Sequence, residues 1–314
     1  MKEIIKQASA PNPLPPDAFE PLPASEKNAE FIAMESKTFL QDAWRNFRRN
    51  KLALISLCFI ILMCLMAIFV PILSPYTYDG MDGSALNQLP SLQHWFGTDK
   101  FGRDIFVRVM FGARISLAVG FAAAGINMVI GIVYGGIAGY VGGKADLIMM
   151  RVVDMLYSIP NLLYIILIML IFGSNMFSVL LGICISSWVG MARLVRTQVM
   201  SLKEQEFSLA AFVMGASKSR ILFKHLIINS IGPIIVSLTL MVPSAIFQES
   251  FLGFVGIGIS APMSSWGTLA NDARLVINSY PLQIVWPVLS ICLTMLALNF
   301  LGDGLGEALD PKKR

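Results

Sequence analysis

The sequence contains few charged residues: they make up 14% of the 314 residues, whereas soluble globular proteins carry roughly 25%. Hydrophobic residues make up 55% of the chain and the mean hydropathy is +0.67, which is more apolar surface than one soluble core of this size can bury. This excludes an ordinary soluble domain. The net charge of +4 does not indicate nucleic acid as a partner, because the basic residues lie in short segments between apolar blocks.

Histidine and cysteine are also scarce, with two and four residues respectively. The four cysteines lie inside apolar blocks without a CxxC pair or a ligand-like spacing to His94 or His225, so we expect free thiols and no metal site. Neither histidine has the sequence neighbours of a catalytic site. The phosphate-binding pattern GxxxxGK[ST] does not occur either, and the nearest fragment, 142–145, lacks the first glycine and the hydroxyl residue. We therefore predict a non-catalytic chain that binds no cofactor.

Long hydrophobic runs are the main feature that is present. A bilayer core of about 30 Å requires roughly 20 apolar residues in a helix, because lipid offers no partner to an unpaired backbone amide. The sequence predicts an all-α, polytopic membrane protein with about six transmembrane helices, at 52–73, 115–139, 156–172, 177–194, 231–256 and 282–301. The third is interrupted by 158–160, and a charge at mid-bilayer costs about 2.5–3.5 kcal/mol, so we expect Asp154 near an end.

Lys and Arg indicate the orientation. Nineteen of the 24 lie in segments on the amino-terminal side of the membrane, which predicts that both termini are cytoplasmic. The proline-rich residues 1–35 predict a disordered cytoplasmic tail and not a secretory signal. Residues 36–51 predict either an amphipathic interfacial helix or an ordinary charged flank. Segment 74–114 is expected to be an extracytoplasmic loop, 115–301 the core domain, and 302–314 a cytoplasmic tail.

Two features inside the spans have alternative interpretations. Gly131, Gly135 and Gly139 recur every four residues, which favours close helix packing over a role in substrate binding. Glu249 is costly in lipid, so it should face the bundle interior or a wet cavity. Glu249 and Ser250 are candidates for a translocation pathway, and a structural hydrogen bond at Glu249 is an equally good explanation.

The segment 201–229 predicts a helix-turn-helix protrusion on the cytoplasmic side. Gly215 tolerates the positive φ that ends a helix, and Ser217 or Ser219 can cap the next one. The protrusion is rich in large apolar residues, among them Phe207 and Phe212, and each such side chain is worth roughly 1.5–3 kcal/mol when buried. A soluble partner would cover them; alternatively, the first helix folds back against the bundle.

This protrusion resembles the coupling loop of ABC-transporter permeases, the EAA loop, in which a Glu-Ala-Ala triplet is followed at fixed spacing by Gly and then Ile-x-Leu-Pro. Ala210, Ala211 and Gly215 stand in register, and Ile227 stands where the pattern has Leu. The chain departs from the pattern at Leu209 (Glu), His225 (Ile) and Ile228 (Pro).

Three further segments extend the resemblance. They are HWFGTDKFGRDIFVRVMFGARISL at 94–117, FQESFLGFVGIGISAPMSSWGTL at 247–269 and NFLGDGLGEALDPKKR at 299–314. In this order they resemble the second permease subunit of oligopeptide and dipeptide importers, and the likeness runs from about residue 39 to the end.

The resemblance implies a type I ABC importer permease fold in the bacterial plasma (inner) membrane. It implies a second homologous permease, two cytoplasmic ATPase subunits that bind ATP and Mg²⁺, and an extracytoplasmic peptide-binding protein. It favours oligopeptides as the substrate, with dipeptides, glutathione or nickel as alternatives; a secondary transporter is a weaker reading, because no internal repeat is evident.

The outer loop contains a candidate site: Arg103 with Asp99 or Asp104 would brace a turn, or these residues would contact the binding protein. The resemblance assigns a second site. The loop that couples to the ATPases comprises Glu204, Glu206, Phe207, Leu209, Ala210, Ala211, Phe212, Met214, Gly215 and Ala216.

Overall fold

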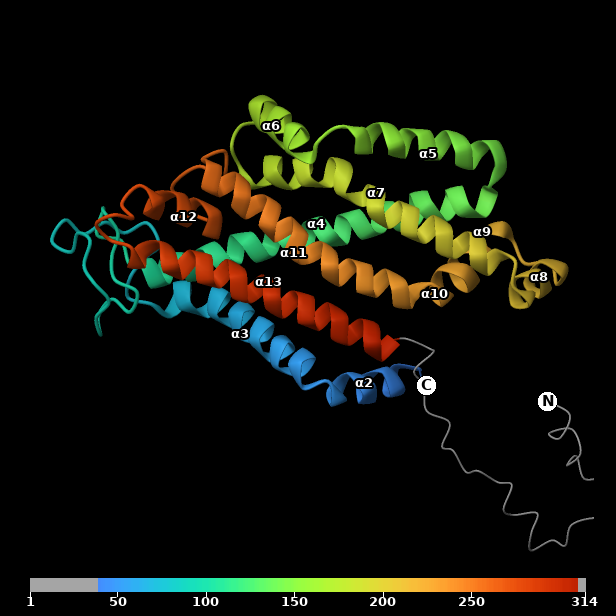
Figure 1. Cartoon of the computed structure of the whole chain (residues 1–314), viewed down its shortest axis with the longest axis horizontal. Helices are drawn as coiled ribbons and strands as arrows, with labels where there is room; N and C mark the ends of the chain where they lie inside the picture. The colour runs from blue at the N-terminus through green and yellow to red at the C-terminus, as the bar shows by residue number, and fades with distance from the viewer. Residues whose placement is uncertain (1–38, 310–314) are drawn as a thin grey trace, which may run out of the picture. The chain divides into compact units, whose positions relative to one another are not determined.

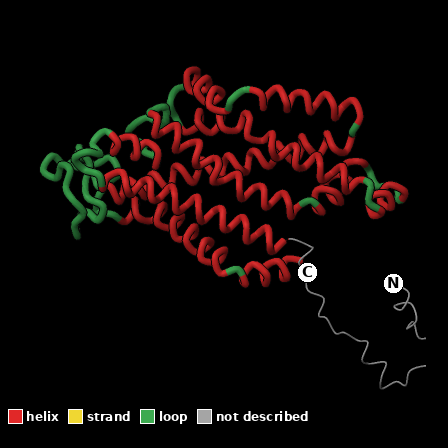
Figure 2. The backbone as a smooth tube through the Cα atoms, viewed as in Figure 1, coloured by secondary structure: helices red, strands yellow, loops and turns green. Residues whose placement is uncertain are grey.

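The computed structural model describes residues 39–309, which form helices and loops without a strand (Figures 1 and 2). The expected tail 1–35 lies outside the described residues, as do 36–38 of the expected interfacial helix and 310–314 of the carboxyl-terminal tail. The helices are α2 (Phe39–Arg49), α3 (Lys51–Leu73), α4 (Ile105–Val141), α5 (Gly143–Ser158), α6 (Asn161–Phe172), α7 (Met176–Lys203), α8 (Glu206–Val213), α9 (Lys218–Arg220), η3 (Ile221–Leu226), α10 (Ile227–Asn229), α11 (Ile231–Val255), α12 (Trp266–Arg274) and α13 (Leu282–Leu309).

Five helices, α3, α4, α7, α11 and α13, are long and apolar enough to cross a membrane. Four of them, α3, α4, α7 and α13, each contain one predicted span and extend beyond it. The second predicted span began too late: α4 starts at Ile105, so the loop that precedes it is 74–104 and not 74–114. The Asp104 side chain accepts the Val107 N–H at 2.8 Å and caps this helix. The hydrophobic run misses these ten residues because they include Arg108 and Arg114.

The third predicted span, 156–172, is wrong as a continuous helix. The chain forms α5 and α6 instead, bent by 79° at a short break. Pro160 lacks an N–H, and the preceding Ile159 has the extended conformation that proline imposes on its neighbour. Asp154 lies near the end of α5, as expected, and pairs with Arg193 at 2.8 Å.

The beginning of α3 and the end of α13 lie together. Asn50 Nδ2 donates to Glu307 Oε2 at 3.1 Å, and a Cβ at Gly304 would overlap the side chain of Ala53. A chain that returns to its starting side crosses the membrane an even number of times, so the bent pair α5–α6 supplies the sixth crossing. This agrees with the predicted number of spans. Which side faces the cytoplasm stays a prediction.

Helices α4 and α7 pack closely along a seam of glycines. A Cβ at Gly131 would overlap the side chain of Met191, and a Cβ at Gly135 would overlap the carbonyl of Ala192. One turn further on, Gly139 lies equally close to the backbone of Arg196. The prediction that these glycines serve helix packing is therefore confirmed.

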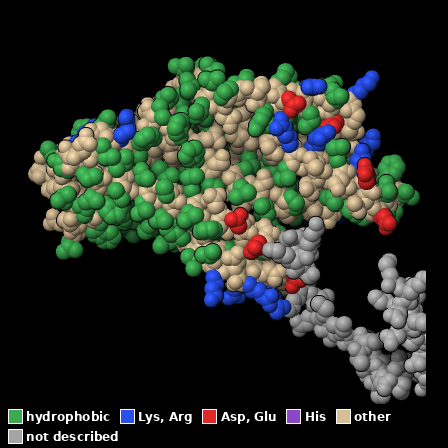
Figure 3. All heavy atoms as spheres, in the orientation of Figure 1, with side chains coloured by type: hydrophobic (Ala, Val, Ile, Leu, Met, Phe, Trp, Pro, Cys, Tyr) green, Lys and Arg blue, Asp and Glu red, His purple; other side chains and the backbone are tan. Residues whose placement is uncertain are grey.

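The outer surface is apolar along the middle of the bundle. On the face drawn in Figure 3, hydrophobic side chains cover the central part, and charged side chains gather mainly at the end that carries α8. Leu73, Leu170 and Ile171 are each more than 70% exposed, as expected for a surface that faces lipid. We call the two ends the loop end (residues 74–104 and α12) and the α8 end (α8, α9 and η3).

Helix α2 confirms that residues before the first span form a helix. Phe47 is buried among Ala53 and Ala308, whereas Trp44 is half exposed and stacks on Phe47. One face of α2 thus packs on the start of α3 and the end of α13. Its location at the membrane surface stays a prediction.

Candidate coupling and translocation sites

Helix α8 projects beyond the long helices at one end of the bundle (Figure 1). A turn at 204–205 separates it from α7, and Gly215 ends it with a φ of +81°. Ala216 N–H donates to the Ala211 carbonyl at 3.0 Å, as in a Schellman motif. Ser217 then caps the next helical segment through the Arg220 N–H. The predicted helix, turn and restart are confirmed, with the helix at 206–213.

The side chains of α8 have an unusual distribution. The small residues Ser208 and Ala211 are buried, whereas Phe212, Val213 and Met214 are 64%, 83% and 80% exposed. A hollow of about 600 Å³ lies beside them, between α8, the end of α4 and Phe223. Because Lys203, Lys218 and other charged side chains surround this surface, it lies where a water-soluble protein can reach it. The other candidate coupling residues, Glu204, Glu206, Phe207, Leu209 and Ala210, are also exposed, and Ala216 is half-buried.

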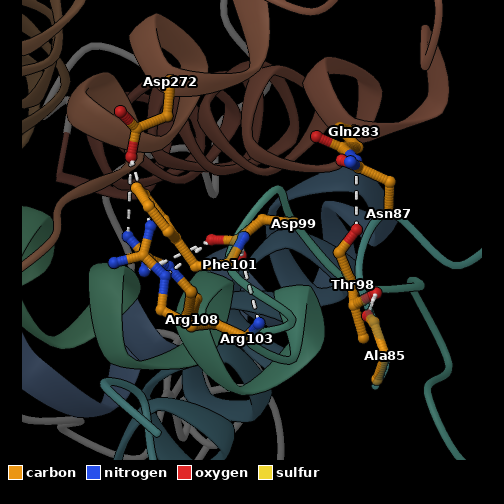
Figure 4. Close-up of polar contacts among 9 residues, drawn as sticks. All are labelled: Ala85, Asn87, Thr98, Asp99, Phe101, Arg103, Arg108, Asp272 and Gln283. Atoms are coloured by element: carbon orange, nitrogen blue, oxygen red, sulfur yellow. Dashed lines mark hydrogen bonds and ion pairs between the residues drawn. The ribbon is translucent and has the colours of Figure 1, made fainter. Parts of the chain in front are cut away.

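At the loop end, two arginines and two aspartates form an ion-pair cluster (Figure 4). Arg103 Nε donates to Asp99 Oδ2 at 2.7 Å, and Arg108 Nη1 lies 3.5 Å from the same oxygen. Asp272, on α12, lies 3.8 Å from Arg103 and 3.7 Å from Arg108. The cluster therefore connects the loop, α4 and α12.

Asp99 also accepts the N–H groups of Phe101 and Arg103, so it organises the turn as well as the ion pairs. The side chains of Asp99 and Arg103 are only 14% and 9% exposed. The predicted brace thus forms between Arg103 and Asp99. Contact with a binding protein stays a prediction.

Asp104 has a different role from the one considered in the sequence. Its Oδ2 atom lies 2.8 Å from His94 Nδ1, and the His94 ring lies against Tyr76. Both members of the pair are buried. Asp104 therefore ties the loop to the first turn of α4 and does not pair with Arg103.

The rest of the loop is held by polar contacts to α13. Gln283 Nε2 donates to Asn87 Oδ1 at 3.1 Å and to the Thr98 carbonyl at 3.0 Å (Figure 4). Earlier in the loop, hydrogen bonds from the side chain and backbone of Ser84 lower the pKa of Asp82. The loop is thus an ordered part of the fold.

Glu249 is enclosed within the chain. It is 1% exposed, and its Oε2 atom accepts hydrogen bonds from Ser116 Oγ at 2.8 Å and Ser250 Oγ at 3.3 Å. Ser116 Oγ also accepts the Trp266 N–H at 3.4 Å. The carboxyl group therefore connects α4, α11 and α12, as the structural-hydrogen-bond interpretation expects. A role for Glu249 and Ser250 in a pathway stays a prediction.

Sequence comparison identifies the protein class. Residues 131–314, more than half of the chain, match the family described as binding-protein-dependent transport system inner membrane component. The chain belongs to this family. Residues 38–90 match the N-terminal TM domain of oligopeptide transport permease C. The two matches together therefore include the first helices of the bundle, α2 and α3, and its last helix, α13.

Individual members of the permease family are similar over nearly the whole chain. The oligopeptide transport system permease protein OppC of Bacillus subtilis is 46% identical and is matched over 96% of this chain and 99% of its own length. The dipeptide transport system permease protein DppC of the same organism is 44% identical, over 98% and 97%. OppC of Escherichia coli is 42% identical, over 92% and 96%.

A solved structure has a similar fold. The methionine ABC transporter MetNI, in an inward-facing conformation, matches with a TM-score of 0.51 at 19% identity, over 66% of this chain and 96% of that chain. The family, the relatives and the long apolar helices together establish an ABC importer permease of the OppC/DppC type, a multi-pass protein of the bacterial inner membrane.

Some residues of these sites were not identified from the sequence. Arg108 and Asp272 complete the ion-pair cluster, and His94 forms a buried pair with Asp104. An arginine at the start of an apolar helix was the available signal for Arg108, because such a residue needs an acidic partner. Asp272 and His94 gave no comparable signal, since their partners are distant in sequence or separated by a turn.

Proposed function

We propose that this chain is a permease subunit of an oligopeptide importer, forms half of the translocation pathway with a second homologous permease, and couples to two cytoplasmic ATPase subunits through α8. The observation that carries the proposal is the exposed apolar surface of Phe212, Val213 and Met214 on a helix that projects from the bundle. Leaving such side chains in water is unfavourable, and a protein partner removes that cost.

The substrate assignment rests on relatives. The relative with 46% identity is named for oligopeptides and the one with 44% identity for dipeptides, so oligopeptides are the first choice and dipeptides the second. An extracytoplasmic peptide-binding protein would deliver the substrate. ATP and Mg²⁺ would be bound by the ATPase subunits, and this chain would bind no cofactor.

The connection from α8 to the membrane supports a mechanical role. Ala211 of α8 packs in one core cluster with Ile221 and Leu226 of η3 and with Ile234 of α11. When ATP draws the ATPase subunits together, displacement of α8 would pass through η3 to α11 as a movement of packed side chains. Gly215 matters because its positive φ sets the angle between α8 and η3.

The test is Gly215→Val in the full complex. Valine strains the positive φ, so α8 should lose its docking angle: we expect normal membrane levels, at least a tenfold loss of ATPase subunits on co-purification, and loss of vanadate-sensitive peptide uptake. Gly256→Val is the matched control, because Gly256 also ends a helix at positive φ, +92°, but at the loop end. Normal uptake by Gly215→Val, or equal loss of ATPase in both variants, would contradict the proposal.

A further inference from the structure

A polar hollow lies between the helices, away from both ends. Its volume is about 220 Å³, and four segments line it: α4, the break between α5 and α6, α7 and α11. The polar side chains that line it are amides and hydroxyls, and none of its lining residues is charged. They include Asn127, Asn161, Ser186, Ser187, Ser244 and Gln248.

Several polar atoms around this hollow have no hydrogen-bond partner. They are Asn127 Oδ1, Ser187 Oγ and Gln248 Oε1, and Asn127 is 99% buried. Neighbouring groups are paired: Ser186 Oγ donates to Asn161 Oδ1 at 2.6 Å, and Gln248 Nε2 donates to Ser244 Oγ at 3.4 Å. Buried polar groups in proteins normally have a partner, and lipid cannot supply one. The hollow opens to the surface of this chain, since Tyr157, Asn161 and Ser244 are exposed, so water or a polar ligand can reach these unpaired atoms.

The helix break gives a second, independent reason. The break between α5 and α6 lies at Ile159 and Pro160. Tyr157 and Asn161, on either side of the break, line the hollow. Non-helical backbone at membrane depth is tolerated only where it is buried in protein or lines a water-filled cavity. The 79° bend thus lies next to the unpaired side-chain atoms, and a water-filled hollow would accommodate both features.

We propose that this hollow is the subunit's share of the pathway and that it accepts a peptide through its backbone, by neutral hydrogen bonds, without recognising charge. Amide and hydroxyl groups both donate and accept, so they can follow the alternating N–H and C=O groups of any peptide. The lining has no carboxylate, imidazole or thiolate to hold a metal cation such as nickel and no Lys or Arg to attract an anion. The inference rests on the proposed function and specifies its substrate class.

The inference also changes which residue of α11 faces the pathway. Glu249 points to Ser116 and Ser250 inside the chain, whereas its neighbour Gln248 lines the hollow. A neutral amide at this position, in place of a carboxylate, does not attract a cationic peptide in preference to an anionic one.

Thiol accessibility tests whether the hollow is wet. Ser187→Cys and Ser244→Cys are made in a background with the four native cysteines replaced, and Leu170→Cys, at a position 77% exposed on the outer face of α6, is the control. The rates are measured in two states, without nucleotide and with ATP and vanadate. In at least one state, we expect a charged methanethiosulfonate reagent to modify the two hollow positions at least tenfold faster than Leu170→Cys. Equal rates in both states would overturn the proposal.

Charge substitution tests the substrate class in a chain that keeps its cysteines. Gln248→Lys and Gln248→Glu are compared for uptake of Ala-Asp-Ala and Ala-Lys-Ala, with the same binding protein in each strain. We expect the ratio of anionic to cationic uptake to rise at least threefold in the first variant and to fall at least threefold in the second, with Gln248→Asn close to wild type. A ratio that stays constant in all three variants would overturn the proposal.

The wild-type complex separates the two hypotheses. ATP-dependent peptide uptake by wild type together with unreactive hollow positions and constant uptake ratios would reject the inference and leave the proposed function standing. Absence of ATP-dependent peptide uptake by wild type would reject the proposed function itself.

Discussion

The two ends of the bundle differ in how their side chains are partnered. At the loop end, polar groups pair with one another: Asp99 with Arg103, His94 with Asp104, and Gln283 with Thr98. At the α8 end, large apolar side chains such as Phe212 and Met214 stay exposed. The loop end therefore carries a polar cluster that stabilises this chain, whereas the α8 end carries the apolar surface that we propose binds another protein. Substitutions at the two ends should affect different measurements.

The largest effect on stability is expected for Asp99→Ala at the loop end. The change leaves the buried Arg103 and Arg108 with only the half-exposed Asp272 as an acidic partner and removes the acceptor for two backbone N–H groups. Breaking one partner of a buried ion pair costs about 3–5 kcal/mol, so the thermal midpoint of the purified complex should fall clearly. Asp79→Ala, in an exposed part of the same loop, is the control. Equal midpoints for the two variants would show that the cluster does not hold the loop end together.

A smaller effect, on binding and not on stability, is expected for Phe212→Ser with Met214→Ser at the α8 end. Exposed residues contribute little to folding, within about 0.5 kcal/mol, but central interface residues can contribute about 2 kcal/mol or more to association. Recovery of ATPase subunits with the permease should fall at least tenfold while the thermal midpoint of the isolated permease is unchanged. A lowered midpoint with normal recovery would reverse the comparison between the two ends.

The smallest effect is expected for Gln283→Leu. The substitution removes two hydrogen bonds between α13 and the loop, and a net loss of about 0.5–1.5 kcal/mol per bond is typical. Hydrogen exchange of the backbone amides near Thr98 should accelerate, while recovery of ATPase subunits stays normal. Gln93→Leu, which changes an exposed glutamine of the same loop, should leave exchange unchanged; equal acceleration in both variants would contradict the assigned contact.

The same contrast explains what the sequence could predict. Hydrophobic length and the conformational preference of Gly215 are local properties, and the number of spans and the end of α8 followed from them. The start of α4 depends on partners for Arg108 and Arg114, and Arg114 bonds to the carbonyls of Ala67 and Ile68 on α3. A window of hydropathy contains no such tertiary contact, so the prediction began ten residues late.

The sites divide in the same way. The apolar character of α8 was readable, but the sequence left open whether its side chains are exposed or fold back against the bundle. The directions of the Gln248 and Glu249 side chains could not be predicted. Adjacent helical residues point about 100° apart, and only the packing of α11 on Ser116 decides that Glu249 is the one that faces the interior of the chain. Proline at 160 indicated a break, but the angle of 79° depends on how α5 and α6 pack on α7.

The glycine seam between α4 and α7 has a mechanical consequence. The two backbones touch at Gly131, Gly135 and Gly139. If one helix slid along the other, side chains would replace these glycines at the contacts and would clash. The pair should therefore move as one rigid body. Helix α11 reaches the α8 end through the π-helical turn Ile221–Leu226, and such turns are frequent at functional sites. We expect displacement of α8 to leave α4 and α7 fixed together and to pass through this turn to α11.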